Sequence, residues 1–249
     1  MKLTSWSDIL KTGKASNELF NASIGVFDGI HLGHQKLLKR LSNHLEKSLV
    51  VTFRNNPKEI LRSELFGGHL SSWSEKLQRL EDLGIDEVLW IDFSTNFATM
   101  TAEVFLQKLQ EFYSLRNFVL GWNFRLGRHP GLGVAELEDL LKNGKVEVIE
   151  PVFYQQILVS SSEVRKSIHN GQMDLAAKLL GRSYRIEVHE AEYRHGGYWV
   201  SKTACKQVVP KEGAYPVFVG RKSILNVEKD GMFWESPPGP VAKEIIFEE

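Results

Sequence analysis

The chain of 249 residues has a single cysteine, Cys205, and therefore cannot form a disulfide bond within itself. Proteins of a reducing compartment commonly use cysteine this way, so a disulfide-stapled secreted domain is excluded. No apolar run approaches the length of about 20 residues that a membrane-spanning helix needs. Residues 1–20 also lack the apolar core of a secretory signal. We therefore expect a cytoplasmic protein without a membrane anchor.

An excess of charge of either sign is also missing. Lys and Arg together number 31, as do Asp and Glu, so the formal net charge is zero. Without an overall field of one sign, neither nucleic acid nor an anionic membrane surface is favoured as a partner. Hydrophobic residues make up 42% of the chain, an ordinary globular value that suits one or two domains. The composition makes no statement about the oligomeric state.

Apolar segments of strand type alternate with segments of helical periodicity over the first 150 residues. The predicted strands are residues 22–27, 48–53, 87–91, 117–121 and 146–149. Ser72 and Thr101 are placed to cap two of the intervening helices, and Gly84 is placed to end one of them. Five successive strand–helix units predict a Rossmann-like α/β domain, with a parallel sheet and helices on both faces. Ligands of such sheets bind at the carboxyl ends of the strands.

The segment between the first predicted strand and the next helix carries the densest group of candidate residues, which are Gly25, Phe27, Asp28, His31, Gly33 and His34. A strand, a glycine-containing turn and a helix N-terminus form an anion site, because unpaired N–H groups and the positive helix end face the ligand. His31 and His34 lie three residues apart, so near the first helical turn both imidazoles can project to one side. Such a pair suits polyphosphate chemistry, although two histidines in a polar loop can equally be structural.

A second candidate segment, residues 159–165, reads Val-Ser-Ser-Ser-Glu-Val-Arg. Ser160 or Ser161 can cap a helix, and Glu163 completes a capping box if Ser160 is the cap. The remaining hydroxyls could then converge with Arg165 on one anion, because arginine binds phosphate with two hydrogen bonds. The alternative is a well-capped surface helix.

Residues 25–34, Gly-Val-Phe-Asp-Gly-Ile-His-Leu-Gly-His, resemble the signature of prokaryotic FAD synthetases in their FMN adenylyltransferase module. Residues 159–165 are similar to that family's Val-Ser-Ser-Thr-x-Ile-Arg, with Ser162 in place of threonine. The His-Leu-Gly-His segment alone also occurs in class I aminoacyl-tRNA synthetases, but residues 160–167 lack the lysine-containing loop of those enzymes. The resemblance to FAD synthetases covers about residues 20–185.

This resemblance implies adenylyl transfer from ATP to FMN, which gives FAD and pyrophosphate, with Mg²⁺ accompanying ATP. It implies that His31, His34 and Arg165 are catalytic, and that Asp28 is the candidate for holding Mg²⁺ through water. The ATP-binding residues that it implies are Gly25, Phe27, Asp28, His31, Gly33, His34, Gly121, Ser161, Ser162 and Arg165. For FMN the corresponding residues are Phe53, Asn56, Pro57, Asn123, Phe124 and Arg125.

The chain departs from the family pattern on the flavin side. Family members commonly have Phe-x-Pro-His-Pro after the second strand, whereas residues 53–57 read Phe-Arg-Asn-Asn-Pro. The segment after the fourth predicted strand, residues 121–128, keeps the family frame Gly-x-Asp/Asn-Phe-x-Phe-Gly-Lys but has Leu126 and Arg128 in place of phenylalanine and lysine. These departures affect the choice of flavin-stacking residues more than the chemistry.

Beyond Tyr184 the sequence becomes aromatic and alternating, with strands predicted at residues 184–188, 198–200, 215–219 and 223–227. In the family a riboflavin kinase barrel follows at this position and carries a Gly-x-Pro-Thr-Ala-Asn segment. That segment is missing here, and Thr-Ala-Cys at 203–205 is the nearest match. We therefore expect residues 1–183 to form an FMN adenylyltransferase domain. Residues 184–249 would form a small all-β domain, a remnant of the kinase barrel without riboflavin kinase activity.

Two other functions stay open at this point. One is a sister nucleotidyltransferase that acts on nicotinate mononucleotide or phosphopantetheine, against which residues 27–29 and the Asn123 segment argue. The other is a non-catalytic flavin- or nucleotide-binding regulator, against which the presence of His31, His34 and Arg165 argues.

Overall fold

The computed structural model describes residues 1–13, 18–61, 64, 66–93, 95–127, 131–141 and 144–248. Contacts divide the chain into two compact units. The first unit comprises Met1–Phe27, Gly33–Leu65 and Leu77–Pro151. The second unit comprises Asp28–Leu32, Phe66–Lys76 and Val152–Glu249. The second unit therefore takes two short segments from the N-terminal part of the chain.

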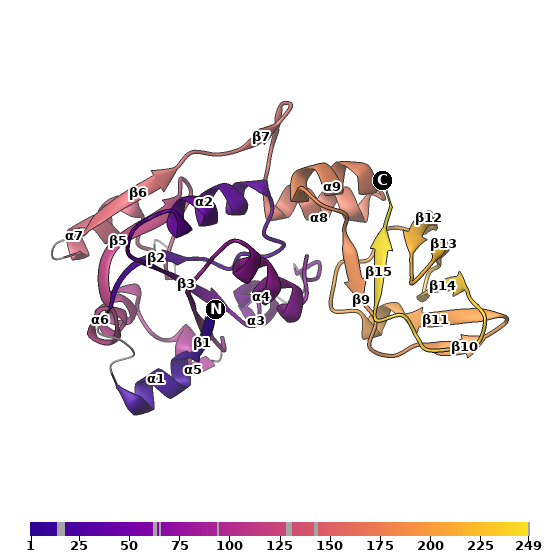
Figure 1. Ribbon diagram of the computed structural model, residues 1–249, viewed down its shortest axis with the longest axis horizontal. Helices are drawn as coiled ribbons and strands as arrows, with labels where there is room; N and C mark the ends of the chain where they lie inside the picture. The colour runs from indigo at the N-terminus through magenta and orange to yellow at the C-terminus, as the bar shows by residue number, and fades with distance from the viewer. Residues whose placement is uncertain are drawn as a thin grey trace. The chain divides into compact units, whose positions relative to one another are not determined.

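The first unit is built on a six-stranded sheet in the order β1-β4-β3-β2-β5-β6 (Figure 1). The strands are β1 Lys2–Ser5, β2 Leu19–Ile24, β3 Lys47–Phe53, β4 Glu87–Ile91, β5 Ser114–Gly121 and β6 Lys145–Ile149. Every neighbouring pair is parallel. The predicted Rossmann-like sheet is confirmed, and β3 is buried along nearly its whole length, as strands of parallel sheets are.

Helices connect the strands of this sheet. They are α1 Trp6–Thr12, α2 Leu32–Ser42, α3 Pro57–Leu61, α4 Trp73–Asp82, α5 Thr95–Ala98, α6 Ala102–Phe112 and α7 Val134–Leu140. Thr101 caps α6 as predicted, since its hydroxyl accepts the Val104 N–H at 3.3 Å. Gly84 follows α4 with a φ of 76°, the left-handed conformation of a C-terminal glycine. The core of the first unit lies between the sheet and residues such as Phe105 and Leu109 of α6.

The sequence analysis assigned no element to residues 1–21, and the structure corrects this. Strand β1 pairs with β4 at the edge of the sheet, and α1 follows with Ser5 as its cap. The Ser5 hydroxyl accepts the Asp8 N–H at 3.0 Å. The four residues of β1 are mostly exposed, so they show neither an apolar run nor a clear alternation, and pattern reasoning has little to detect.

The second unit contains a seven-stranded sheet in the order β10-β11-β14-β13-β12-β15-β9, all antiparallel (Figure 1). The strands are β9 Arg185–Glu187, β10 Glu192–Arg194, β11 Gly197–Ser201, β12 Gly213–Phe218, β13 Lys222–Val227, β14 Gly231–Glu235 and β15 Glu244–Phe247. The expected all-β character is confirmed, whereas β10, β14 and β15 were not among the predicted strands. Each of these three is short and flanked by charged or turn residues.

Among the described residues, the second unit contains α8 Ser161–His169, α9 Met173–Leu180 and the first four residues of α4, Trp73–Lys76. The hairpin of β7 Phe153–Tyr154 and β8 Ile157–Leu158 and the 3-10 turn η2 Lys202–Ala204 also belong to it. Val164 of α8 and Leu180 of α9 share one hydrophobic core with Ile186 and Trp234 of the sheet. Contacts thus group residues 152–183 with the C-terminal sheet, and a boundary of functional modules near residue 183 stays a prediction.

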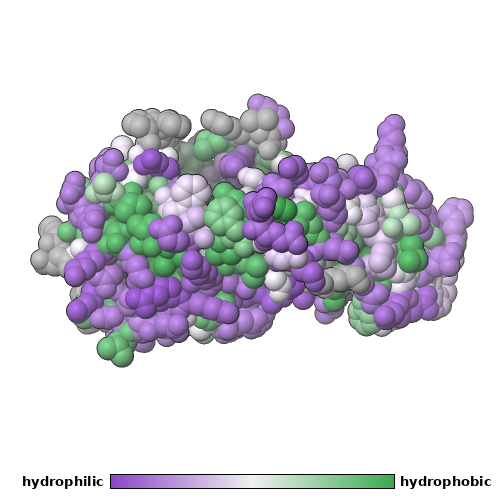
Figure 2. Space-filling view, turned by 90° about the horizontal axis from the view of Figure 1, so that it is seen from above, coloured by the Kyte–Doolittle hydropathy of each residue, from purple (hydrophilic) through white to green (hydrophobic). Residues whose placement is uncertain are grey.

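The surface is mixed. Figure 2 shows hydrophilic residues over much of one face, with hydrophobic patches between them. Within the described part of the chain, no helix combines the length and apolar character that crossing a membrane requires.

We expect Tyr113→Phe to lower the free energy of unfolding of the first unit by about 1–3 kcal/mol, because a buried carboxylate loses a hydrogen bond. The Tyr113 hydroxyl donates to Glu87 Oε1 at 2.6 Å, and both residues are buried. Urea unfolding would measure the change, with Tyr193→Phe as the control because Tyr193 is 46% exposed. Equal stability of the Tyr113 variant and the parent chain would contradict the expectation.

Candidate active site

The backbone between β2 and α2 is strained. Phe27, Gly29 and Ile30 have φ values of 50°, 79° and 39°. Non-glycine residues rarely adopt positive φ, and such conformations persist where the surroundings impose them, commonly at functional sites. A Cβ on Gly29 would lie 2.9 Å from Leu70 Cβ, so only glycine fits there. We refer to residues 28–32, which belong to the second unit, as the His31 loop.

Asp28 anchors the His31 loop through three hydrogen bonds. Its Oδ1 accepts the Leu70 N–H at 2.8 Å, and its Oδ2 pairs with Arg165 Nη2 at 2.5 Å. The Asp28 backbone carbonyl accepts the Ser161 hydroxyl at 2.9 Å. The Asp28 side chain is 6% exposed and the Arg165 side chain 17% exposed, so this ion pair is largely shielded from bulk water. Hydrogen bonds between ionised groups are stronger than those between neutral groups.

The Arg165 guanidinium forms hydrogen bonds with three different residues of the second unit. Its Nε donates to the Gly68 carbonyl at 3.0 Å and its Nη1 to the Ser161 carbonyl at 3.2 Å, in addition to the Asp28 pair. Ser160 is the cap of α8, because its hydroxyl accepts the Glu163 N–H at 3.2 Å. The structure thus brings Asp28, Ser161 and Arg165 into contact with one another, while Ser162 is exposed on the first turn of α8.

His31 is buried at the end of this loop and only 6% exposed. Burial, together with the nearby Arg182 cation, lowers the pKa of its imidazole to about 4. The side chain is therefore a neutral imidazole near pH 7. It can donate one hydrogen bond but adds no charge to the site until an anion approaches.

Lys76 is a buried cation that the sequence analysis missed. It is 6% exposed, its Nζ lies 5.5 Å from the centre of the Trp73 ring, and burial lowers its pKa to about 8 against the opposing effect of Asp28. A signal was available in the sequence. Lys76 lies four residues before Leu80, which places a lysine on the apolar face of the predicted helix.

His34 lies in the first turn of α2, in the first unit. Its ring packs edge-on against Phe27, with ring centroids 5.2 Å apart. A Cβ on Gly25 would lie 3.0 Å from Phe27 Cζ, so this glycine makes room for the Phe27 ring. Gly33 is the second residue of α2. Gly25, Phe27 and His34 thus pack together between the end of β2 and the start of α2.

Three of the residues assigned to FMN have structural roles. Phe53 is 8% exposed and packs edge-on against Phe93 and Phe97 in the core. The Asn56 side chain accepts the Lys58 N–H at 3.0 Å, which caps α3. Pro57 is the first residue of α3, a position where its missing N–H has no helical partner to lose.

The other three FMN candidates follow Gly121, the last residue of β5. β2 and β5 are neighbours at the point where the strand order reverses, which is where sheets of this kind bind ligands. Asn123 is exposed, and Phe124 packs partly against the core. Arg125 lies against the start of α7, since its Nη1 would be 2.1 Å from a Cβ on Gly133. Arg128 lies outside the described residues.

No group of three or more His, Cys, Asp or Glu side chains in the described ranges is arranged to hold a metal ion. Both carboxylate oxygens of Asp28 already accept hydrogen bonds from Leu70 and Arg165. This environment does not fit direct coordination by Asp28, and a contact through water stays a prediction.

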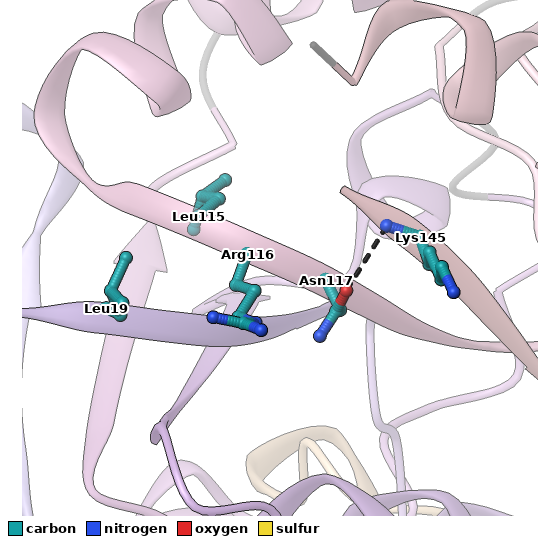
Figure 3. A pocket seen from close by; sticks show the side chains of 5 residues that line it. All are labelled: Leu19, Leu115, Arg116, Asn117 and Lys145. Atoms are coloured by element: carbon teal, nitrogen blue, oxygen red, sulfur yellow. Dashed lines mark hydrogen bonds between the residues drawn. The ribbon is translucent and has the colours of Figure 1, made fainter. Parts of the chain in front are cut away.

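A cavity of about 590 Å³ lies elsewhere in the first unit (Figure 3). Its lining residues are Leu19, Leu115, Arg116, Asn117 and Lys145. Leu19 and Lys145 begin β2 and β6, so the cavity is at the amino ends of the strands. The Asn117 side chain accepts the Lys145 N–H at 3.2 Å, and Arg116 pairs with Glu46 at 3.1 Å. This cavity is therefore separate from the strand ends where the candidate residues of this unit lie.

Comparison with known proteins adds independent findings. The family model for FAD synthetase matches residues 14–163. A protein of Buchnera aphidicola subsp. Schizaphis graminum is 30% identical over 217 residues, which cover 82% of this chain and 70% of the relative. One of Escherichia coli is 28% identical over 224 residues, covering 84% of this chain and 72% of the relative. Both are named bifunctional riboflavin kinase/FMN adenylyltransferase.

A crystal structure described as a macrolide-efflux protein from Streptococcus pneumoniae has a TM-score of 0.81 and 20% identity. The match covers 99% of this chain and 89% of that one, and at this identity it concerns the fold alone. The family match spans more than half of the chain and includes the His31 loop and the residues around His34. The chain belongs to the FAD synthetase family.

Proposed function

We propose that this chain transfers the adenylyl group of ATP to FMN, forming FAD and releasing pyrophosphate. The observation that carries the proposal is the strained segment between β2 and α2, which presents His31 and His34 at a helix start. This segment lies within the region matched to the FAD synthetase family, and the relatives' names include FMN adenylyltransferase activity.

The chemistry requires no covalent enzyme intermediate. An oxygen of the FMN phosphate attacks the α-phosphorus of ATP in line, a new P–O bond forms, and the bond to the bridging oxygen breaks as pyrophosphate leaves with the bonding electrons. Catalysis of such a displacement rests on positioning the reactants and stabilising the charge that develops.

His34 and His31 have different proposed roles. His34, in the first turn of α2, would interact with the α-phosphate, where the positive helix end also favours negative charge. The neutral imidazole of His31 would donate a hydrogen bond to a phosphate oxygen. The approaching anion would favour the protonated form and raise the pKa of His31 from its low value in the unliganded chain.

The remaining ATP contacts are proposed as follows. Ser161 and Ser162 would serve the β- and γ-phosphates, and Arg165 would hold Asp28 while facing the same phosphates. Gly25, Phe27, Gly33 and Gly121 would let the backbone approach the nucleotide. A divalent cation, which we propose is Mg²⁺, would enter bound to the ATP phosphates, as this ion usually does.

On the FMN side, Asn123 is the strongest candidate of the set because it is exposed and follows the strand at which the sheet order reverses. Phe124 and Arg125 share its segment. Phe53, Asn56 and Pro57 would act by shaping that side of the site, since each already has a role in packing or capping.

We also propose that the chain has no riboflavin kinase activity. The support is the missing Gly-x-Pro-Thr-Ala-Asn segment, in place of which the nearest match, Thr203–Cys205, overlaps the 3-10 turn η2. Residues 184–249 would then have a structural role and no catalytic role.

Incubation of the pure chain with Mg-ATP and either FMN or riboflavin, followed by chromatography of the flavins, tests both proposals. We expect FAD from FMN and no FMN from riboflavin. FMN formed from riboflavin would overturn the single-activity proposal. Absence of FAD, with turnover of nicotinate mononucleotide or phosphopantetheine instead, would overturn the assignment of substrate.

We expect His34→Ala to lower kcat for FAD formation by about 10²–10³-fold, the usual range for one group that stabilises developing charge. Steady-state kinetics with saturating FMN would measure it. His189→Ala is a matched control, because the His189 side chain is 74% exposed and lies outside the proposed site. Near-normal turnover of the His34 variant would remove this residue from the mechanism.

We expect His31 to titrate with a pKa of about 4 in the unliganded chain, far below its ordinary value of 6.5. Between these values the unfolded chain binds a proton that the folded chain does not, so stability is lost as pH falls through this window, by about 1.4 kcal/mol per pKa unit. NMR titration of histidine side chains, with the His31 signal assigned from a His31→Gln variant, would measure the pKa. A His31 signal that titrates near pH 6.5 would contradict a buried neutral imidazole.

A further inference from the structure

Arg182 contacts the His31 loop from the end of α9. Gly181 ends this helix in the left-handed conformation, with a φ of 70°, and the chain then turns back. The Arg182 Nη2 donates to the Gly29 carbonyl at 2.9 Å, and its Nε donates to Glu75 Oε1 at 2.9 Å. The side chain is only 11% exposed, so both hydrogen bonds are largely shielded from water.

Glu75 extends this contact to the C-terminal sheet. Its side chain is 8% exposed, and its Oε1 also lies 3.8 Å from Arg185 Nε on β9. Arg185 Nη1 in turn pairs with Glu244 Oε2 on β15 at 3.0 Å. β9 and β15 are hydrogen-bonded neighbours in the sheet (Figure 1). Residues of alternating charge thus connect the Gly29 carbonyl to the paired strands β9 and β15.

A second set of contacts ties the start of α4, the helix that carries Glu75, to β9. The hydroxyls of Ser72 and Ser74 both donate to Glu187 Oε1, the first at 2.6 Å. The Glu187 N–H donates to Gln207 Oε1 at 2.7 Å. Glu75, on the first turn of α4, is therefore linked to β9 through its own contact with Arg185 and through the two serines that precede it.

The His31 loop has little freedom to compensate if this support is lost. Gly29 lies in close contact with Leu70 and Leu180, because a Cβ at that position would be 2.9 Å and 3.4 Å from their side chains. His31 follows only two residues later. A displacement of about 1 Å at a reacting group can lower a rate by about 10²-fold.

We propose that Arg182 is a positioning residue for the His31 loop, and that β9 and β15 support it through Glu75 and Arg185. The inference rests on the proposed function, in which this loop binds the ATP phosphates. It assigns the C-terminal sheet a role in adenylyl transfer, as the support of a phosphate-binding loop.

The test compares four variants of the full chain, Arg182→Met, Arg182→Lys, Arg185→Met and Arg221→Met. Arg221 is a matched control, because it is exposed in the turn between β12 and β13 and its Nη2 donates to the Glu235 carbonyl at the end of β14. For each variant, kcat and KM are measured for ATP and FMN separately. Binding of a non-hydrolysable ATP analogue is measured by calorimetry, and thermal unfolding is recorded.

We expect Arg182→Met to lower kcat/KM for ATP by at least about 10-fold, with KM for FMN within about twofold of the parent value. Arg182→Lys should recover part of the loss, because an ammonium retains the charge without the planar two-sided contact. Arg185→Met should show a smaller loss of the same kind, and Arg221→Met should be unchanged.

The proposal is overturned if Arg182→Met keeps its kcat/KM for ATP, or if it impairs ATP and FMN equally. Should Arg182→Met fail to fold, Arg182→Lys decides the question, and a normal kcat/KM for ATP in that variant overturns the proposal. If the parent chain makes no FAD, the proposed function fails, and binding of the ATP analogue then tests the loop. Weaker binding of the analogue by Arg182→Met than by the parent chain supports the positioning role. Equal binding by the two proteins, or no binding by the parent chain, overturns it.

Discussion

The ion pair between Asp28 and Arg165 is the interaction on which the candidate site depends. It is largely shielded from water, and both partners have further contacts, to Leu70 for Asp28 and to Gly68 and Ser161 for Arg165. Removing one partner of such a pair leaves the other charge without compensation in a shielded place, which is strongly destabilising. The left-handed backbone of Gly29 and Ile30 is therefore maintained by contacts from helix α8 and from the segment before α4. A loop held in this way can present His31 to a ligand without first having to become ordered.

Much of the fold follows from the sequence because its signals are local. The apolar segments that form β2 to β6, the caps Thr101 and Ser160 and the terminal glycine Gly84 all act within a few residues of their own position. β1, β10, β14 and β15 were missed because short or edge strands have weak periodicity. Pairing with distant strands, rather than local preference, determines their conformation.

The candidate site was only partly predictable, for a related reason. Asp28, Ser161 and Arg165 were identified from recognisable segments, and the structure places them in contact. Glu75 follows Ser72 in a capping-box pattern and Arg182 follows the helix-ending Gly181, but neither local pattern indicates that these two charged side chains are buried. Their burial depends on which surfaces pack together, and a charged residue in a sequence normally indicates exposure. On the flavin side, Phe53 and Asn56 show the opposite case, in which residues at expected positions are already engaged in packing and capping.

The sequence separation of these contacts has a consequence for biosynthesis. The hydrogen bonds that shape the His31 loop join residues 137 positions apart in the case of Asp28 and Arg165, and 153 positions apart in the case of Gly29 and Arg182. Contacts of such long range require the closure of large chain loops and form late in folding. On the ribosome, the loop is translated early but meets its partners only after α8 and α9 have emerged. A newly made chain could thus form the parallel strands of its first unit before the His31 loop is held in place, because the contacts of this loop are complete only after residues up to Arg182 have left the ribosome.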